Sequence, residues 1–321
     1  MSEAVRTTCP YCGVGCGVLA TRLVDGSVEV RGDPEHPANR GRLCSKGTAL
    51  AATLGTAGRL VHPEVDGRVV DWESAVDSVA ARLQQCLAQH GPESVALYVS
   101  GQMLTEDYYV ANKLMKGYIG TANIDTNSRL CMSSAVSGHL RAFGEDVVPV
   151  DYADLESCDL LVLVGSNLAW CHPVLMQRVQ AARERRPQLR IVVIDPRRTP
   201  TAQMADLHLP LRSGTDVLLF NGLLSWLDAQ GYTDEAYVTT HTSGAQQALQ
   251  AARAASTDAL ATAQACGLEP ALVQQFFDCF AATGRVITAF SQGVNQSSAG
   301  VDKVNSIINC HLLTGRIGRA G

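Results

Sequence analysis

Four cysteines near the start of the chain limit its possible folds more than any other feature. Cys9, Cys12, Cys16 and Cys44 have the spacing C-x2-C-x3-C-x27-C, within the segments CPYCGVGCGV and GRLCSKG. Three thiolates within eight residues can converge only if their loop folds around a common centre. The glycines between the cysteines let the backbone approach that centre closely. The pattern predicts a four-sulfur site that holds a soft metal centre.

Two kinds of centre fit these cysteines. An iron–sulfur cluster is favoured over zinc, because four-cysteine zinc sites usually consist of two C-x2-C pairs. Disulfides fit poorly, because the chain has an odd number of cysteines, 11, and no visible export signal. Lys46, two residues after Cys44, could offset the negative charge of the thiolates. The alternative for Lys46 is an ordinary surface lysine.

Length and charge exclude several classes of protein. A chain of 321 residues predicts two or three domains. With 26 Lys and Arg against 31 Asp and Glu, it has no broad basic field for nucleic acid. The longest apolar run, 160–164, is too short to span a bilayer. The first residues show no apolar signal segment, so we expect a cytoplasmic protein without membrane attachment.

Strand and helix patterns alternate along most of the chain. Asp-Gly turns predict β-hairpins at 18–32 and 59–71. Buried strands are expected at 94–100, 159–164, 190–195 and 285–290. Helices are expected at 73–89, 105–118, 174–186, 215–230 and 303–313, with further helix in 245–282. This order predicts an α/β fold with parallel sheets that follow a small N-terminal β-hairpin domain.

Polar residues follow two of the expected strands. Gly165, Ser166 and Asn167 come directly after strand 159–164, where open α/β sheets bind ligands and backbone N–H groups suit a diphosphate. Asp195 and Arg197 follow the next strand, and the carboxylate could accept hydrogen bonds from a ribose diol or a guanine edge. The G-x-G-x-x-G fingerprint is absent, and a purely structural turn explains these residues equally well. Cys131, taken alone, is best explained as a small buried hydrophobe.

In combination, these segments resemble the molybdopterin oxidoreductase family, whose members bind a molybdenum bis(molybdopterin guanine dinucleotide) cofactor. The resemblance runs the length of the chain. It is carried by CPYCGVGC…CSKG, SGQ at 100–102, NSRLCMSSAV, VGSNLAWCHP, IDPRRT, SGTD at 213–216, QGVNQ at 292–296 and HLLTG at 311–315.

The resemblance implies roles for particular residues. The four N-terminal cysteines would ligate a [4Fe-4S] cluster, Lys46 would lie between that cluster and a pterin, and Cys131 would be the protein thiolate on molybdenum. The residues implied to contact the molybdenum cofactor are Gln102, Asn127, Gly165, Ser166, Asn167, Asp195, Arg197, Gly214, Asp216, Gln292 and Gln296. Gln292 departs from the family pattern, in which a Met is common at this position.

Within the family the chain is most similar to the assimilatory nitrate reductases. This implies reduction of nitrate to nitrite, with electrons from ferredoxin, flavodoxin or an NADH-dependent flavoprotein. The formate dehydrogenases of the family are the first alternative. They usually carry a His at the position of Met132 and an Arg at that of Asn305, so both residues favour nitrate. The second alternative is an iron–sulfur electron relay without molybdenum, and the complete motif around Cys131 argues against it.

The resemblance also predicts a domain division. A [4Fe-4S] domain covers 1–55. An α/β body comprises 56–130 and 285–321, and a Rossmann-like guanosine-dinucleotide domain covers 131–284. Family members are much longer than 321 residues, so we expect the chain to be an N-terminal portion with an incomplete body.

Overall fold

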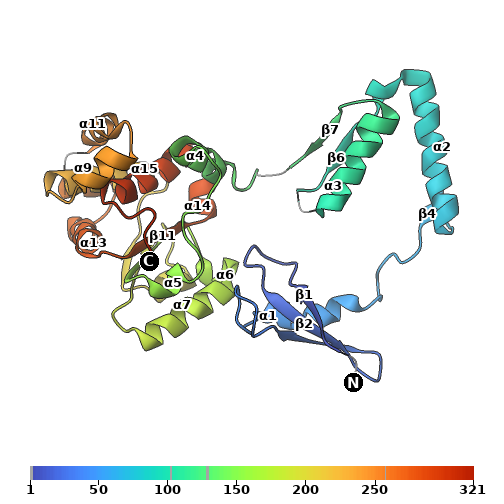
Figure 1. Ribbon diagram of the computed structural model, residues 1–321, viewed down its shortest axis with the longest axis horizontal. Helices are drawn as coiled ribbons and strands as arrows, with labels where there is room; N and C mark the ends of the chain where they lie inside the picture. Colours follow the sequence, from blue (N-terminus) through green and yellow to red (C-terminus); the bar gives the residue numbers. More distant parts are fainter. Residues whose placement is uncertain (1–2, 102, 128–129, 257) are drawn as a thin grey trace. The chain divides into compact units, whose positions relative to one another are not determined.

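The structure, a computed structural model, describes residues 3–101, 103–127, 130–256 and 258–321 (Figure 1). The chain forms two compact units, one of Met1–Ala51 with Met132–Gly321 and one of Ala52–Cys131. Within the described ranges, no helix is long and apolar enough to cross a membrane. Gln102 lies outside the described residues.

The N-terminal segment forms a three-stranded antiparallel sheet. Its strands are β1 (Val5–Thr8), β2 (Gly17–Arg22) and β3 (Val28–Gly32), in the order β1-β2-β3. β2 and β3 form the predicted hairpin, and its turn is closed by the carboxylate of Asp25, which accepts from the Ser27 N–H at 3.0 Å. A short helix, α1 (Ser45–Thr48), and a 3-10 turn, η1 (Leu50–Leu54), follow.

The unit Ala52–Cys131 contains the second predicted hairpin and the long predicted helix. Its elements are β4 (Glu64–Val65), β5 (Arg68–Val69), α2 (Trp72–His90), η2 (Pro92–Ser94), β6 (Leu97–Val99), α3 (Thr105–Asn112), the π-helix η3 (Lys113–Ile119) and β7 (Ile124–Thr126). Asp71 caps α2 by accepting from the Ser74 N–H at 2.7 Å, and Gly91 ends it with a positive φ. β6 pairs in parallel with β7, a strand not expected from the sequence.

A four-stranded parallel sheet forms the centre of the other unit. Its strands are β8 (Leu160–Val164), β9 (Arg190–Ile194), β10 (Leu207–Leu209) and β11 (Val286–Phe290), in the order β10-β9-β8-β11. The chain proceeds outward from β8 through β9 to β10 and then returns to place β11 on the other side of β8. The direction of strand order therefore reverses between β8 and β11, which is where open α/β sheets bind ligands.

Helices cover both faces of this sheet, as its unbroken apolar strands require. Leu161, Leu163 and Val193 pack with α5 (Asp154–Ser157) and α7 (Pro173–Arg185). The alternate residues Leu160 and Val162 pack with α9 (Asp216–Ala229), α13 (Pro270–Ala282) and α15 (Gly300–Leu313). The remaining helices are α4 (Ser133–Phe143), α6 (Leu168–Cys171), α8 (Pro200–Gln203), α10 (Glu235–His241), α11 (Ala245–Ala255), α12 (Ala259–Cys266) and α14 (Gln292–Asn295). The predicted α/β class is confirmed.

The segment 285–321 differs from the predicted domain division. β11 pairs with β8 along its whole length, from Val286 opposite Leu160 to Phe290 opposite Val164. α15 packs on α4 and α9. Strand pairing and helix packing therefore place this segment in the sheet and core of the unit that contains residues 132–284, and not with 56–130 as predicted.

Candidate functional site

The first three cysteines lie at and between the ends of two paired strands. Thr8 of β1 pairs with Gly17 of β2, so Cys9 and Cys16 face each other where the strands end, and the Cys9 N–H donates to the Cys16 carbonyl at 2.9 Å. Gly15 has a φ of 67°, which lets the loop between Cys12 and Cys16 turn back. Cys44 lies at the N-terminus of α1. Local structure thus brings Cys9 and Cys16 together, and the convergence of all four thiols stays a prediction.

The Cys16 thiol responds to both burial and the other cysteines. Burial, together with negative charge on Cys12, Cys9 and Cys44, raises the pKa of the Cys16 thiol to about 11. Four thiolates at this place therefore require positive charge to compensate them, which iron in a cluster supplies. No three or more His, Cys, Asp or Glu side chains in the described ranges are arranged to hold a single metal ion. Four cysteine thiols are the donors that a [4Fe-4S] cluster takes, so the residues fit the cluster by their chemistry.

Lys46 lies on α1 with its side chain exposed. Burial lowers the pKa of His172, and the positive charge of Lys46 lowers it further. The lysine is therefore within electrostatic range of His172, which directly precedes α7. The Gln177 amide of α7 donates to the Leu43 carbonyl at 3.4 Å, so the segment around Cys44 lies beside α7.

The loops after β8 and β11 touch at the point where the strand order reverses. Gly165 follows β8 with a φ of 53°, and the Gly293 N–H donates to its carbonyl at 3.0 Å. A Cβ atom on Gly165 would lie 2.7 Å from the Cα of Gly293. Only glycine fits this contact, which holds two strand-end loops together beside the predicted nucleotide site.

The predicted polar residues lie around these loops. Ser166 is buried, and the Asn167 side-chain oxygen accepts from the Thr201 hydroxyl at 2.8 Å. Asp195 directly follows β9, and its Oδ1 accepts from the Arg197 N–H at 2.8 Å. Its Oδ2 has no hydrogen bond to any residue that the structure describes, so this oxygen is available to a ligand. The Arg197 side chain is exposed.

Asp216 differs from these residues, because its carboxylate forms a buried ion pair with Lys303. Its Oδ2 lies 2.7 Å from the Nζ of Lys303, and the two side chains are 9% and 4% exposed. The lysine also donates to the Gly293 carbonyl at 3.2 Å. Asp216 therefore acts on the strand-end loops through Lys303. Gly214, with a φ of 87°, forms the turn before α9.

The loop after β11 is also joined to α4. Gln292 and Gln296 are exposed at the two ends of α14. Between them, buried Asn295 accepts from the Ala135 N–H at 2.9 Å with its side chain and from the Ser134 hydroxyl at 2.7 Å with its carbonyl. These bonds cap α4, to which Met132 offers no side-chain hydrogen bond.

Cys131 and Met132 form the turn directly before α4. The Cys131 thiol is exposed, whereas the residue taken alone was expected to be buried. Met132 is 40% exposed and lines a cavity of about 450 Å³, together with residues of β11 and α15. The helix start, which Asn295 fixes, therefore holds Met132 at the edge of this cavity.

Asn305 connects two helices. Its amide donates to the Gly138 carbonyl of α4 at 2.8 Å, and its Oδ1 accepts from Arg141 at 3.2 Å. In the unit Ala52–Cys131, the Asn127 side chain accepts from the Gly101 N–H at 2.6 Å. Asn127 thus lies at the carboxyl ends of β6 and β7, a position typical of ligand contacts.

Two protein-family models match this chain and identify its family. Residues 59–321 match the molybdopterin oxidoreductase family, and residues 2–54 match the molybdopterin oxidoreductase Fe4S4 domain. This chain belongs to the molybdopterin oxidoreductase family. Its two matched regions support a molybdenum–pterin cofactor and a 4Fe-4S cluster, as predicted.

Relatives in the family are longer than this chain. It is 55% identical to a nitrate reductase of Klebsiella oxytoca over 98% of its length, and 48% identical to one of Shewanella frigidimarina over 99%. It spans only 36% and 35% of those two proteins. Lower identities, 37% and 32%, relate it to a periplasmic nitrate reductase of Desulfovibrio desulfuricans and to the F420-dependent formate dehydrogenase 1 subunit alpha of Methanococcus maripaludis.

A solved structure confirms the fold of this family member. Acetylene hydratase from Pelobacter acetylenicus matches 98% of the chain and 44% of its own, with a TM-score of 0.81 and 21% identity.

Sequence reasoning missed several residues that support these sites. They are Lys303, Asn295, Arg178, Tyr152 and Asn39, all of which act through contacts distant in sequence. One signal was available for Lys303. It occupies the buried stripe of α15 with Val304 and Ile307, and a lysine in such a stripe requires an internal partner.

Proposed function

We propose that this chain belongs to a molybdenum nitrate reductase that reduces nitrate to nitrite in the cytoplasm during nitrate assimilation. The observation that carries the proposal is the 55% identity to a nitrate reductase across 98% of the chain. That match includes the cysteine loop, the strand-end loops and the turn at Cys131. Reduction of one nitrate consumes two electrons and two protons and yields nitrite and water.

The cysteine loop would be the point of electron entry. Cys9, Cys12, Cys16 and Cys44 would hold the [4Fe-4S] cluster. Lys46, exposed on α1 two residues after Cys44, would lie between the cluster and a pterin. Its positive charge favours arrival of an electron at the cofactor. Ferredoxin, flavodoxin or an NADH-dependent flavoprotein would supply the electrons.

The strand-end loops would hold the cofactor in its bis(guanine dinucleotide) form. Backbone N–H groups around Gly165, Ser166 and Asn167 suit a diphosphate, and the free oxygen of Asp195 suits a ribose diol or a guanine edge. Exposed Arg197 would offset phosphate charge. Gly214 and Asp216 would support these loops, and Gln102, Asn127, Gln292 and Gln296 would contact the pterins.

Cys131 would supply the thiolate that binds molybdenum, and its exposed thiol is consistent with that role. The bound molybdenum cofactor supplies the two-electron chemistry by which an oxygen atom leaves nitrate. Met132 and Asn305 favour nitrate over formate, because neither brings a charge. The amide of Asn305 is already bonded to Gly138 and Arg141, so this residue would shape the pocket without binding an anion directly.

The test uses the full-length protein from a host that makes the molybdenum cofactor. With reduced viologen we expect nitrite from nitrate, and with oxidised viologen little oxidation of formate. Cys131→Ala should abolish nitrate reduction. Cys171→Ala, which also removes an exposed thiol, is the matched control and should retain it.

Metal analysis separates the remaining alternative. A preparation that contains both iron and molybdenum supports the nitrate reductase. Iron without molybdenum in a cofactor-replete preparation would instead indicate an electron relay. Formate oxidation in place of nitrite production would indicate a formate dehydrogenase.

A further inference from the structure

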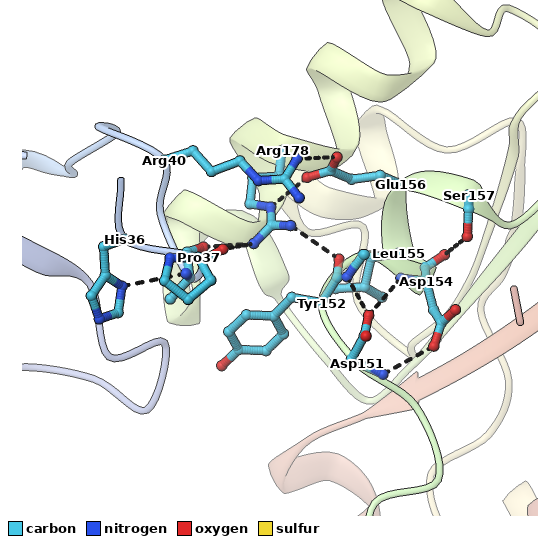
Figure 2. A network of polar contacts seen from close by, with 12 residues as sticks. His36, Pro37, Arg40, Asp151, Tyr152, Asp154, Leu155, Glu156, Ser157 and Arg178 are labelled. Atoms are coloured by element: carbon cyan, nitrogen blue, oxygen red, sulfur yellow. Dashed lines mark hydrogen bonds and ion pairs between the residues drawn. The ribbon is translucent and has the colours of Figure 1, made fainter. Parts of the chain in front are cut away.

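One buried arginine connects the cysteine domain to the parallel-sheet domain. The Arg178 side chain, on α7, is 1% exposed. Its Nη1 donates to the carbonyls of Pro37 and Ala38 at 2.9 and 2.7 Å. Its Nε donates to Glu156 at 2.5 Å, and its Nη2 donates to the Tyr152 carbonyl at 3.3 Å. Figure 2 shows these contacts converging on the guanidinium.

The first route from Arg178 to the cysteines passes through Tyr152. The guanidinium lies 5.7 Å from the centre of the tyrosine ring and holds the carbonyl of the same residue. The Tyr152 hydroxyl donates to the Gly13 carbonyl at 3.2 Å, with the Val14 carbonyl at 3.5 Å. Gly13 and Val14 lie between Cys12 and Cys16. Arg178 therefore orients a side chain that contacts the middle of the cysteine loop.

The second route passes through the segment that Arg178 holds by its carbonyls. Asn39 directly follows Ala38 and is fully buried. Its side chain accepts from the Gly17 N–H at 2.8 Å and donates to the Gly17 carbonyl at 3.0 Å. Gly17 directly follows Cys16. Arg178 thus acts on the cysteine loop from two sides.

The charge of Arg178 is also compensated. Glu156 accepts from Arg178 with one oxygen and pairs with Arg40 of the cysteine domain at 2.9 Å with the other. A buried guanidinium with several fixed acceptors resists displacement. If it moved, the carbonyls and the carboxylate that accept from it would lose their hydrogen bonds. Lysine carries the same charge but cannot form the planar set of contacts.

We propose that Arg178 is a positioning residue for the iron–sulfur cluster, acting through Tyr152 and Asn39 to hold the loop between Cys12 and Cys16 closed around it. This inference rests on the assignment of the four cysteines to the cluster. Without Arg178 the loop opens and water reaches the cluster. Water stabilises the more negative reduced state, so the midpoint potential rises, and iron is lost more readily.

The test compares full-length, cofactor-loaded variants. Arg178→Lys keeps the charge and removes the geometry, and Tyr152→Phe removes only the hydroxyl. Arg183→Lys is the matched control, because Arg183 is on the same helix and also combines an ion pair, to Asp206, with a carbonyl contact, to Met204. The measurements are a redox titration followed by electron paramagnetic resonance and the rate of iron loss to a chelator.

We expect Arg178→Lys to raise the midpoint potential and to lose iron about tenfold faster than wild type. Tyr152→Phe should change both quantities in the same direction by less, and Arg183→Lys should match wild type. Wild-type potential and iron loss in both Arg178→Lys and Tyr152→Phe overturn the inference. If Arg178→Lys does not accumulate, Tyr152→Phe alone decides. If the wild-type protein shows no cluster signal, the cluster assignment itself is refuted. If the wild-type protein reduces nitrate but the variants match its midpoint potential and rate of iron loss, only the positioning role of Arg178 is refuted.

Discussion

The carboxylate of Asp216 lies 2.7 Å from the ammonium group of Lys303, and both side chains are almost completely buried. The pair connects the start of α9 to α15, and through the Gly293 carbonyl it reaches the loop after β11. A buried pair of this kind destabilises a protein strongly when one partner is removed.

Lys303→Met should therefore lower the free energy of unfolding by about 3–5 kcal/mol, because it leaves the Asp216 charge buried without a partner. Denaturant unfolding measures the effect. The double variant Asp216→Asn with Lys303→Met removes both charges and should recover most of the loss. A single variant as stable as wild type would contradict the structural role of the pair.

Removal of a cluster cysteine should abolish iron binding. In the full-length protein, Cys16→Ala is expected to lose most iron and the visible absorption of the cluster, because the loop then presents three thiolates. Cys86→Ala is the control, since this half-buried thiol contacts Ser94 in the other unit. Equal iron content in the two variants would exclude the cysteine loop as the cluster site.

Gly165→Ala should disturb the strand-end loops. The φ of 53° disfavours a side chain, and the new Cβ would meet the Gly293 backbone at 2.7 Å. We expect a loss of at least about 1–3 kcal/mol in unfolding free energy. Gly284→Ala, which meets no atom within 4 Å, should have little effect. Similar unfolding midpoints for the two variants would show that the loops can separate without cost.

Asn295→Ala should loosen the start of α4. The substitution removes the acceptor of the Ala135 N–H, and loss of a helix cap costs about 1–2 kcal/mol. Hydrogen exchange is the direct measurement, and the first amides of α4 should exchange about tenfold faster. Amides of α2, which has its own cap at Asp71, should not change. Unchanged exchange in α4 would mean that another group accepts from the Ala135 N–H in place of the Asn295 side chain.

The stability of the chain should depend on pH through His311. Burial, together with positive charge on Arg316, lowers the pKa of this histidine to about 3, so the folded chain holds a neutral ring. The unfolded chain takes up a proton below the ordinary value of 6.5. The contribution to stability is therefore complete above that pH and falls toward pH 3, by about 1.4 kcal/mol per unit.

His311→Gln removes this dependence. The stability difference between wild type and His311→Gln should shrink between pH 7.5 and pH 5, as urea unfolding at both pH values would show. His62→Gln changes an exposed histidine, and its difference from wild type should stay constant. A His311→Gln difference that is independent of pH would refute the assignment.

Local chemistry made much of the fold predictable. The hairpin at Asp25 and Gly26 depends on a turn between neighbouring strands, and the parallel strands carry unbroken apolar runs. The spacing of the N-terminal cysteines predicted an iron–sulfur domain, and the family match over residues 2–54 agrees with that prediction. β7 (IDT) and β10 (LHL) were missed, since each has only three residues and a polar residue interrupts its apolar pattern.

Contacts between distant segments were not predictable. Arg178 was not identified because its partners Pro37, Ala38 and Tyr152 come from other elements, and nothing in the helix sequence marks them. The grouping of 285–321 was wrong for a similar reason. Strand order is decided by pairing across the sheet, and β11 could have joined either unit on its local pattern.

The cap on α4 has a consequence for biosynthesis. Residues 133–143 leave the ribosome well before Asn295 is made, and Asn295 is the residue that fixes the beginning of that helix. During this interval the turn with Cys131 is joined to a helix whose first N–H groups have no acceptor from that loop. The shape around Cys131 is therefore set only after β11 and the loop with Asn295 have been made.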